Sequence, residues 1–230
     1  MKNIFYLFLI VLSPLYAQQS GKSVLEKVKA QYASNKFIQF SSIYNLYKNH
    51  DAKTIYQSHK GEYLKNPDNE VYLKISSTEY YLNNKVSTQI NHDERMIFIT
   101  NPGKINKDEF NIDELLKSFR VSDFKDKKMF WEIELLAKQG SQLPYGRIIL
   151  TIGKDFYIQK QVFYYSTTLN FSKDYSKPDE KTPRLEIVYG KHSNAAIPRA
   201  KFEASKYYTI VSNKVKLSSK YINYEVVDQR

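Results

Sequence analysis

Apolar and polar residues alternate in short runs along most of this chain. Trp131, Ile133 and Leu135 share one face of such a run, and Glu132 and Glu134 share the other. This period of two is typical of a β-strand with one buried and one wet face. The 20 Tyr and 13 Phe, against a single Trp, suit half-buried pleated surfaces. The sequence therefore predicts a mainly β fold.

The alternating runs and the polar turns between them set the expected strands. In the first half, strands are expected over residues 38–46, 53–64, 71–75, 80–82, 86–90 and 96–100. The second half of the sheet is expected to start near Met129, with strands over residues 131–135, 148–152, 157–165, 185–189, 207–211, 215–217 and 221–227. Residues 172–183 are polar and contain proline, so we expect a mobile loop there. The first 100 residues predict a helix followed by an antiparallel meander.

Two segments carry helical rather than strand signals. Ser23, with Glu26 three residues later, forms a capping-box pattern ahead of apolar residues at helical spacing, which predicts a helix over residues 23–34. Asn111 precedes a second apolar pattern with Glu114 at the third helical position, which predicts a helix over residues 112–119. Both helices are amphipathic, so each must bury one face against another element.

Two short helices cannot cover both faces of a sheet of nine or more strands. Such a sheet is expected to curl, with the helices on its concave side. The predicted fold class is mainly β with two or three short helices. It is an unclosed, curled antiparallel β-barrel with a helical lid over an apolar cavity. An interior filled by ordinary side-chain packing is the alternative.

The N-terminal residues predict export from the cytoplasm. Lys2 is followed by the apolar run Ile4–Leu12, then by Ser13-Pro14 and the small residue Ala17. These are the parts of a secretory signal peptide, and the apolar run is too short to span a bilayer. We expect a signal peptide at residues 1–17 and one domain over residues 18–230. The chain has no Cys, so neither a lipid anchor nor a disulfide is expected, and the mature protein is expected to be soluble and periplasmic.

The formal net charge of +11 favours anionic partners. Lysines are spread evenly, however, with no run of five or more, which is typical of general solubility. Because the protein is expected to be exported, nucleic acid is not expected as a partner.

Residues able to carry catalysis are scattered. His50, His59, His92 and His192 lie in separate segments without metal-ligand spacing. Glu132 and Glu134 share the predicted solvent face of a strand, and no nucleotide-binding or nucleophile motif occurs. We therefore expect no enzyme activity, no metal and no cofactor.

Three segments, taken in order, resemble the LolA-type outer-membrane lipoprotein carrier family over residues 23–200. They are a strand opened by glycine and closed by a basic residue and proline, a turn and apolar strand with an Asn-Pro stop, and a late hairpin: Gly61–Pro67, His92–Pro102, and Leu150–Asp155 followed by Ile158. Asn66 stands where members of that family carry an arginine, and Glu94 replaces a turn glycine. Residues from about 200 onward form a C-terminal extension of the family pattern.

The resemblance implies a periplasmic carrier that shields the acyl chains of lipoproteins, or of other lipids, during transfer to the outer membrane. It would be a monomer that receives cargo from an inner-membrane donor protein and delivers it to an outer-membrane acceptor protein. The candidate lining residues are the more apolar strand faces: Phe40, Val71, Leu73, Ile75, Phe98, Trp131, Ile133, Leu135, Ile148, Leu150 and Ile152. The candidate lid residues are Val24, Leu25 and Val28.

Two other functions stay open on the sequence. The same fold could serve an interaction or sensor protein of the cell envelope. An envelope hydrolase or polysaccharide-modifying enzyme is a third hypothesis, for which Glu132, Glu134, His59 and His92 are the candidate residues.

Overall fold

The computed structural model describes residues 21–33, 36–102 and 110–230. The predicted signal peptide at residues 1–17 lies outside these ranges. A helix over residues 21–33 precedes β1 (Ile38–Tyr47). The remaining elements are β2 (Gln57–Lys65), β3 (Val71–Ile75), β4 (Thr78–Leu82), β5 (Ser87–Asn91), β6 (Met96–Thr100), α2 (Ile112–Ser118), β7 (Phe119–Asp126), β8 (Phe130–Ala137), β9 (Tyr145–Gly153), β10 (Ile158–Tyr165), β11 (Leu169–Asn170), β12 (Glu180–Lys181), β13 (Arg184–Tyr189), η1 (Arg199–Phe202), η2 (Ala204–Lys206), β14 (Tyr208–Val211), β15 (Lys214–Leu217), η3 (Ser219–Tyr221) and β16 (Glu225–Gln229).

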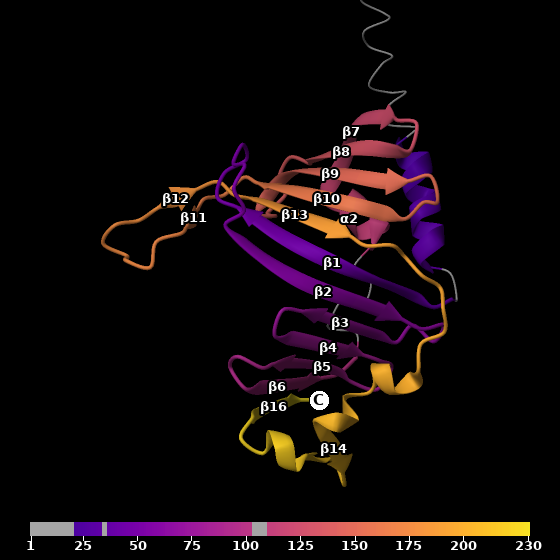
Figure 1. Cartoon of the computed structure of the whole chain (residues 1–230), viewed down its shortest axis with the longest axis vertical. Coiled ribbons are helices and arrows are strands. Elements are labelled where there is room, and N and C mark those ends of the chain that lie inside the picture. The colour runs from indigo at the N-terminus through magenta and orange to yellow at the C-terminus, as the bar shows by residue number, and fades with distance from the viewer. Residues whose placement is uncertain (1–20, 34–35, 103–109) are drawn as a thin grey trace, which may run out of the picture. The chain divides into compact units, whose positions relative to one another are not determined.

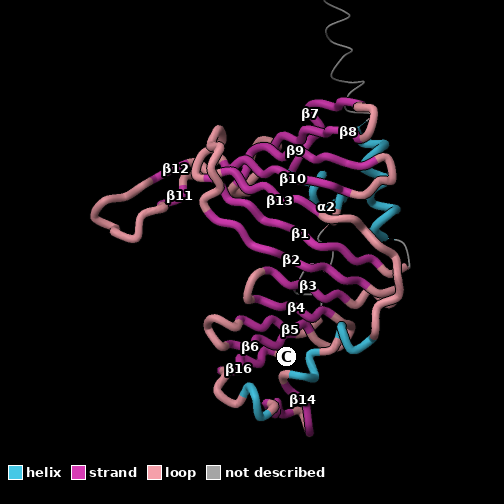
Figure 2. Tube along the Cα trace, in the orientation of Figure 1, coloured by secondary structure: helices cyan, strands magenta, loops and turns pink. Residues whose placement is uncertain are grey.

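Twelve of these strands form one sheet, in the order β16-β6-β5-β4-β3-β2-β1-β13-β10-β9-β8-β7 (Figures 1 and 2). The order has two ends among the described strands, β16 and β7, so hydrogen bonding does not close it into a barrel. The predicted fold class, a mainly β and unclosed sheet with short helices, is confirmed. The expected meander also holds, since β1 to β6 are neighbours in sequence order.

One pairing departs from the predicted antiparallel pattern. β16 pairs with β6 in parallel, with Val226 opposite Ile97 and Asp228 opposite Ile99. Parallel neighbours need a crossover connection. Here the connection from β6 to β16 runs through α2 and β7 to β15. Its last part, residues 190–224, is called the C-terminal segment below, and it contributes side chains to the apolar cluster on one face of this part of the sheet.

The described chain divides into two compact units. Unit 1 contains the N-terminal helix, Ile43–Ser58 and Phe110–Tyr189. Unit 2 contains residues 36–42, residues 59–102 and Gly190–Arg230.

Unit 1 contains a strand that the sequence pattern does not reveal. The prediction that this part of the sheet starts near Met129 is wrong, because β7 precedes it at Phe119–Asp126. The register between β7 and β8 shifts between Val121 and Asp123, as at a β-bulge. A bulge moves the following side chains to the opposite face, so the period of two that marks a strand is broken there.

The two helices lie close to their predicted positions. α2 begins as expected, since the side-chain oxygen of Asn111 accepts a hydrogen bond of 3.0 Å from the backbone N–H of Glu114. The N-terminal helix spans residues 21–33, so Ser23 lies inside it. The capping-box interpretation of Ser23 is therefore wrong, although the predicted apolar face is correct.

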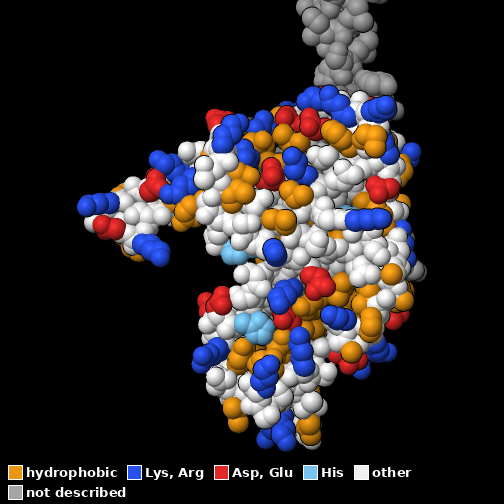
Figure 3. All heavy atoms as spheres, in the orientation of Figure 1, with side chains coloured by type: hydrophobic (Ala, Val, Ile, Leu, Met, Phe, Trp, Pro, Cys, Tyr) orange, Lys and Arg blue, Asp and Glu red, His pale blue; other side chains and the backbone are white. Residues whose placement is uncertain are grey.

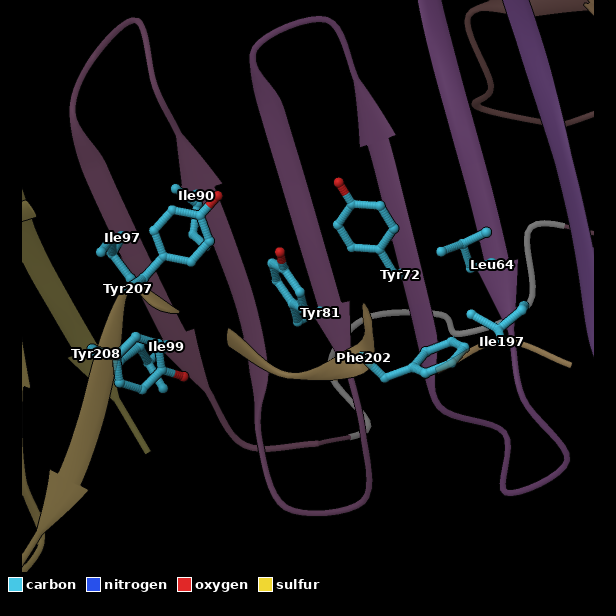
Figure 4. Close-up of a cluster of buried hydrophobic side chains, with 10 residues drawn as sticks. All are labelled: Leu64, Tyr72, Tyr81, Ile90, Ile97, Ile99, Ile197, Phe202, Tyr207 and Tyr208. Carbon is cyan, nitrogen blue, oxygen red and sulfur yellow. The ribbon is translucent and has the colours of Figure 1, made fainter. Parts of the chain in front are cut away.

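Unit 2 is built from hairpins and the C-terminal segment. β2 starts at Gln57 rather than at Lys53, while β3 and β6 match their predicted ranges. One face of strands β2 to β6 carries a buried apolar cluster, to which residues of the C-terminal segment contribute (Figure 4). The cluster consists of Leu64, Tyr72, Tyr81, Ile90, Ile97 and Ile99 from the strands, and Ile197, Phe202, Tyr207 and Tyr208 from the C-terminal segment.

Candidate functional site

Six of the predicted lining residues form a ladder of directly opposed pairs in unit 1. Between β8 and β9, the pairs are Leu135 with Ile148, Ile133 with Leu150, and Trp131 with Ile152. Residues that alternate along a strand share a face, so all six project from the same side of the sheet. The result is a continuous apolar strip two strands wide.

The N-terminal helix crosses this strip. A Cβ atom built on Gly21 would lie 2.8 Å from a methyl carbon of Val121 on β7 and 3.7 Å from Ile133 on β8. The hydroxyl of Tyr32, at the other end of the helix, accepts a hydrogen bond of 3.2 Å from the backbone N–H of Ile158 on β10. A helix that touches β7 and β8 at one end and β10 at the other must pass over β9, which lies between them.

The predicted lid residues form the buried stripe of this helix. Val24, Leu25 and Val28 have exposed fractions of 8%, 0% and 0%. Polar contacts with neighbouring elements flank this buried stripe. Lys29 forms an ion pair of 2.6 Å with Asp113 of α2, at a site where both side chains are substantially exposed.

Aromatic contacts hold the C-terminal end of the helix. The ring of Tyr32 stacks on Phe110 with centroids 4.1 Å apart, and it meets Tyr157 edge-on at 5.6 Å. Rings in such geometries contribute about 0.5–1.5 kcal/mol beyond the area they bury. Tyr32 is therefore the main anchor at this end.

Five of the six ladder residues have no exposed surface: Ile133, Leu135, Ile148, Leu150 and Ile152. An acyl chain could reach them only after the helix moves away. Trp131 is different, because it is partly exposed and stacks on Phe156 with centroids 5.1 Å apart. Lys154 and Lys27 lie over this aromatic pair, so Trp131 belongs to the rim of the strip.

The remaining predicted lining residues lie in unit 2. Tyr63, Leu73, Tyr80, Gln89 and Phe98 are opposite one another across β2 to β6 and form one row on a face of the sheet. By alternation, this face is the one opposite the apolar cluster of the C-terminal segment. Leu73 and Phe98 are partly exposed there.

Two neighbouring rows complete this second face. Val71 lies beside the row of Leu73 and is buried, while Ile75 lies on its other side and is partly exposed. Phe40 is buried, stacks on Tyr63 at 4.9 Å, and has the ring of His192 at 4.5 Å. The eleven predicted lining residues thus fall into two groups, six in unit 1 and five in unit 2.

A buried carboxylate in unit 2 was missed by sequence reasoning. Glu79, only 5% exposed, lies on β4 among the residues of the apolar cluster. It accepts hydrogen bonds from the hydroxyl of Tyr81 at 2.7 Å and from the ammonium of Lys206 at 3.2 Å. The Nε2 atom of His92 lies 3.3 Å from its other oxygen, and the hydroxyl of Tyr224 lies 2.8 Å from Nδ1 of the same ring.

The surroundings of Glu79 keep it charged. Burial alone would raise its pKa, but hydrogen bonds from Tyr81, Lys206 and Tyr207, together with the charge of Lys206, lower the pKa of Glu79 to about 2. Burial and the adjacent carboxylate raise the pKa of the Tyr81 and Tyr207 hydroxyls above their usual range. A Glu beside two tyrosines in a strand gives no sequence signal of burial, and Lys206 lies far along the chain.

The candidate catalytic residues of the hydrolase hypothesis have other partners. The Nζ atom of Lys125 lies 3.1 Å from a carboxylate oxygen of Glu132, and the guanidinium of Arg147 lies 3.7 Å from the carboxylate of Glu134. His92 belongs to the Glu79 network, and His59 lies partly exposed on β2. Within residues 21–33, 36–102 and 110–230, no three His, Asp or Glu side chains are grouped as metal ligands.

The helices in the described ranges are too short or too polar to span a membrane.

No family model matches the chain, and no curated protein matches it. Solved structures do. An uncharacterized conserved protein from Thermus thermophilus is similar with a TM-score of 0.51 and 12% identity, over 91% of this chain and 99% of that one. A LolA superfamily protein from Nitrosomonas europaea matches with a TM-score of 0.38 and 11% identity, over 82% and 98% of the two chains. A DUF1329 family protein from Desulfovibrio piger matches with a TM-score of 0.42 and 9% identity, over 82% and 98%.

The likeness is one of fold. A LolA superfamily structure is among the matches, as the LolA-type resemblance of the sequence predicts for the fold. At 12% identity, the similarity to the Thermus thermophilus protein carries no function across.

Proposed function

We propose that this protein is an exported, periplasmic carrier that binds the acyl chains of lipoproteins or of other lipids. It would shield them from water during transfer towards the outer membrane, without catalysing a reaction. The proposal includes cleavage of the signal peptide near Ala17, a soluble monomer, and donor and acceptor proteins at the two membranes.

One observation carries the proposal. The apolar strip of β8 and β9 is covered by a single amphipathic helix whose peripheral contacts include an exposed ion pair. A strip of this kind, once uncovered, offers many weak apolar contacts and no fixed polar partner. Such a surface suits a ligand that must be bound and later released.

The burial of the helix side chains on the strip and the burial of an acyl chain in their place involve free energies of similar size. Burying Val24, Leu25 and Val28 contributes roughly 6 kcal/mol in total, at about 2 kcal/mol for each side chain. Each methylene removed from water contributes about 0.8 kcal/mol, so roughly eight methylenes offset the loss of these three contacts, and further methylenes are needed to offset those of Tyr32. A longer acyl chain can therefore displace the helix, whereas short apolar solutes cannot.

A disulfide that fixes the helix tests the proposal. The chain contains no Cys, and Gly21 faces Val121 at a distance compatible with a disulfide between Cys residues at both positions. The probe is a fluorescent fatty acid of about 16 carbons, twice the number of methylenes estimated above. We expect the oxidised Gly21→Cys/Val121→Cys protein to bind this probe much more weakly than the same protein after reduction. The reduced form of the same protein controls for the two substitutions, and Val121→Cys alone shows the effect of replacing the valine.

Two results would contradict the proposal. One is equal uptake by the oxidised and reduced forms together with binding that does not depend on chain length. The other is a gently purified wild-type protein that contains no lipid by mass spectrometry and binds no acyl probe. A protein partner captured at one-to-one stoichiometry, unaffected by the disulfide, would instead support the interaction-protein hypothesis.

A further inference from the structure

The C-terminal part of unit 2 carries a group of exposed apolar side chains. Ile210 and Val211, at the end of β14, are 40% and 58% exposed, and Ile222, which follows η3, is 78% exposed. β14 and β15 form a separate two-stranded hairpin. Ser212 and Asn213 connect them with φ values of 48° and 62°, as in a tight two-residue turn.

The two faces of this hairpin have different surroundings. Tyr208 is opposite Leu217, and Ile210 is opposite Val215. Tyr208 is a member of the apolar cluster, and Val215 and Leu217 pack against it. By alternation, Val211, Lys214 and Lys216 project from the other face, away from the cluster.

Three lysines lie close to the exposed apolar residues in the sequence. Lys214, Lys216 and Lys220 are exposed, and none forms an ion pair with another described residue. Residues 208–222 contain no acidic residue. In the following strand, Glu225 is exposed, and Asp228 is held by Arg230 at 2.7 Å. Figure 3 shows Lys or Arg and hydrophobic side chains together over this part of unit 2.

We propose that this hairpin and Ile222 form a membrane-contact surface for anionic phospholipid bilayers. Val211 and Ile222 enter the interfacial region, and the ammonium groups of Lys214, Lys216 and Lys220 lie against the phosphates. Lysine is suited to this position, because its stem contacts apolar surface while its charge stays at the headgroups. A second copy of the chain is disfavoured as the occupant, since it would oppose lysine to lysine.

This surface is distinct from the acyl-binding strip of unit 1, and vesicle binding requires no cargo. The two proposals can therefore fail separately.

Sedimentation of the full mature chain with phospholipid vesicles tests the membrane-contact surface. We expect binding to phosphatidylcholine vesicles that contain phosphatidylglycerol, weaker binding to phosphatidylcholine alone, and loss of binding at high salt. Because each lysine contributes roughly fivefold to the affinity for an anionic surface, Lys214→Gln/Lys216→Gln/Lys220→Gln should weaken binding roughly a hundredfold. Val211→Ser/Ile222→Ser should weaken binding to the same vesicles while leaving the lysines in place.

A matched control lies in unit 1. Tyr175 is 89% exposed, but Asp174 and Asp179 balance the charges of Lys173 and Lys177 near it in the sequence. Tyr175→Ser should therefore bind vesicles like the wild type. All substituted side chains are exposed, so unchanged urea denaturation will show that the variants are folded.

Unchanged vesicle binding by Val211→Ser/Ile222→Ser, or equal binding to neutral and anionic vesicles, would overturn the proposal. A concentration-dependent dimer that Val211→Ser abolishes would overturn it in favour of a second copy. Uptake of the acyl probe by the same variants reports separately on the proposed carrier function.

Discussion

The ammonium nitrogen of Lys206 lies 3.2 Å from a carboxylate oxygen of Glu79, which is buried on β4. The two residues are 127 positions apart in the sequence. This pair ties the C-terminal segment to the centre of the β2 to β6 meander. Because the carboxylate is buried, the pair makes the stability of unit 2 depend on pH and on the partners of Glu79.

Glu79→Gln should remove a pH-dependent part of the stability. The pKa of Glu79 falls from 4.5 to about 2 on folding, so the charged form contributes on the order of 3 kcal/mol above the unfolded pKa. This contribution is lost as the pH falls from 4.5 towards 2. Urea denaturation should show the largest difference between wild type and Glu79→Gln near neutral pH and a shrinking difference in acid. The exposed Glu225→Gln is the control, and an equal difference at every pH would contradict the prediction.

Lys206→Met should destabilise unit 2 more than its exposed position suggests. The substitution leaves the carboxylate of Glu79 buried with only Lys74, at 3.9 Å, as a nearby lysine among the described residues. Because the side chain of Lys206 is half exposed, the cost should be below the roughly 3 kcal/mol of a fully buried pair. Combining Lys206→Met with Glu79→Gln should cost less than the sum of the single changes, because no unpaired charge remains. Free energies of unfolding of the four proteins give this coupling, and strict additivity would argue against a direct interaction.

Phe202→Ala should weaken the attachment of the C-terminal segment. Phe202 is 1% exposed within the apolar cluster, and truncation of a buried Phe costs about 3–5 kcal/mol. Ile222→Ala, at a site that is 78% exposed, should change stability by less than about 0.5 kcal/mol. Thermal unfolding measures both, and similar losses for the two variants would contradict the observed burial.

Gly21→Ala should displace the N-terminal helix from the strip. The added methyl group would lie 2.8 Å from a methyl carbon of Val121, and overpacking of this kind costs about 1–3 kcal/mol. Val121→Ala should rescue the variant by removing that carbon. The single Trp, Trp131, stacks on Phe156, over which Lys27 of the helix lies. Its fluorescence should therefore change in Gly21→Ala and return in the double variant. Unchanged fluorescence in Gly21→Ala would mean that the helix accommodates the methyl group.

The sequence pattern predicts those parts of the fold in which alternation is regular. Leu135, Ile133 and Trp131 are recognisable because their neighbours are Glu, and Asn111 is recognisable as a helix cap because Ile112 and Leu115 follow at helical spacing. β7 escapes prediction because its register shift changes the face of its apolar residues.

The candidate site is predictable only in part. In β3, Tyr72 alternates with Val71 and Leu73, so both faces are apolar and the sequence cannot assign the covered one. The structure shows that the C-terminal segment packs on the face of Tyr72. Long-range partners such as Lys206 for Glu79, and the parallel pairing of β16, have no local signal.

The position of β16 has a consequence for the order of folding. β6 finds its outer partner only in Glu225–Gln229, the final strand of the chain. A polypeptide emerging N-terminus first would complete β1 to β6 while the backbone N–H and C=O groups along β6 still lack that partner. Unpaired edges of this kind recruit other chains, so a nascent or C-terminally clipped protein should be far more prone to aggregate than the finished molecule.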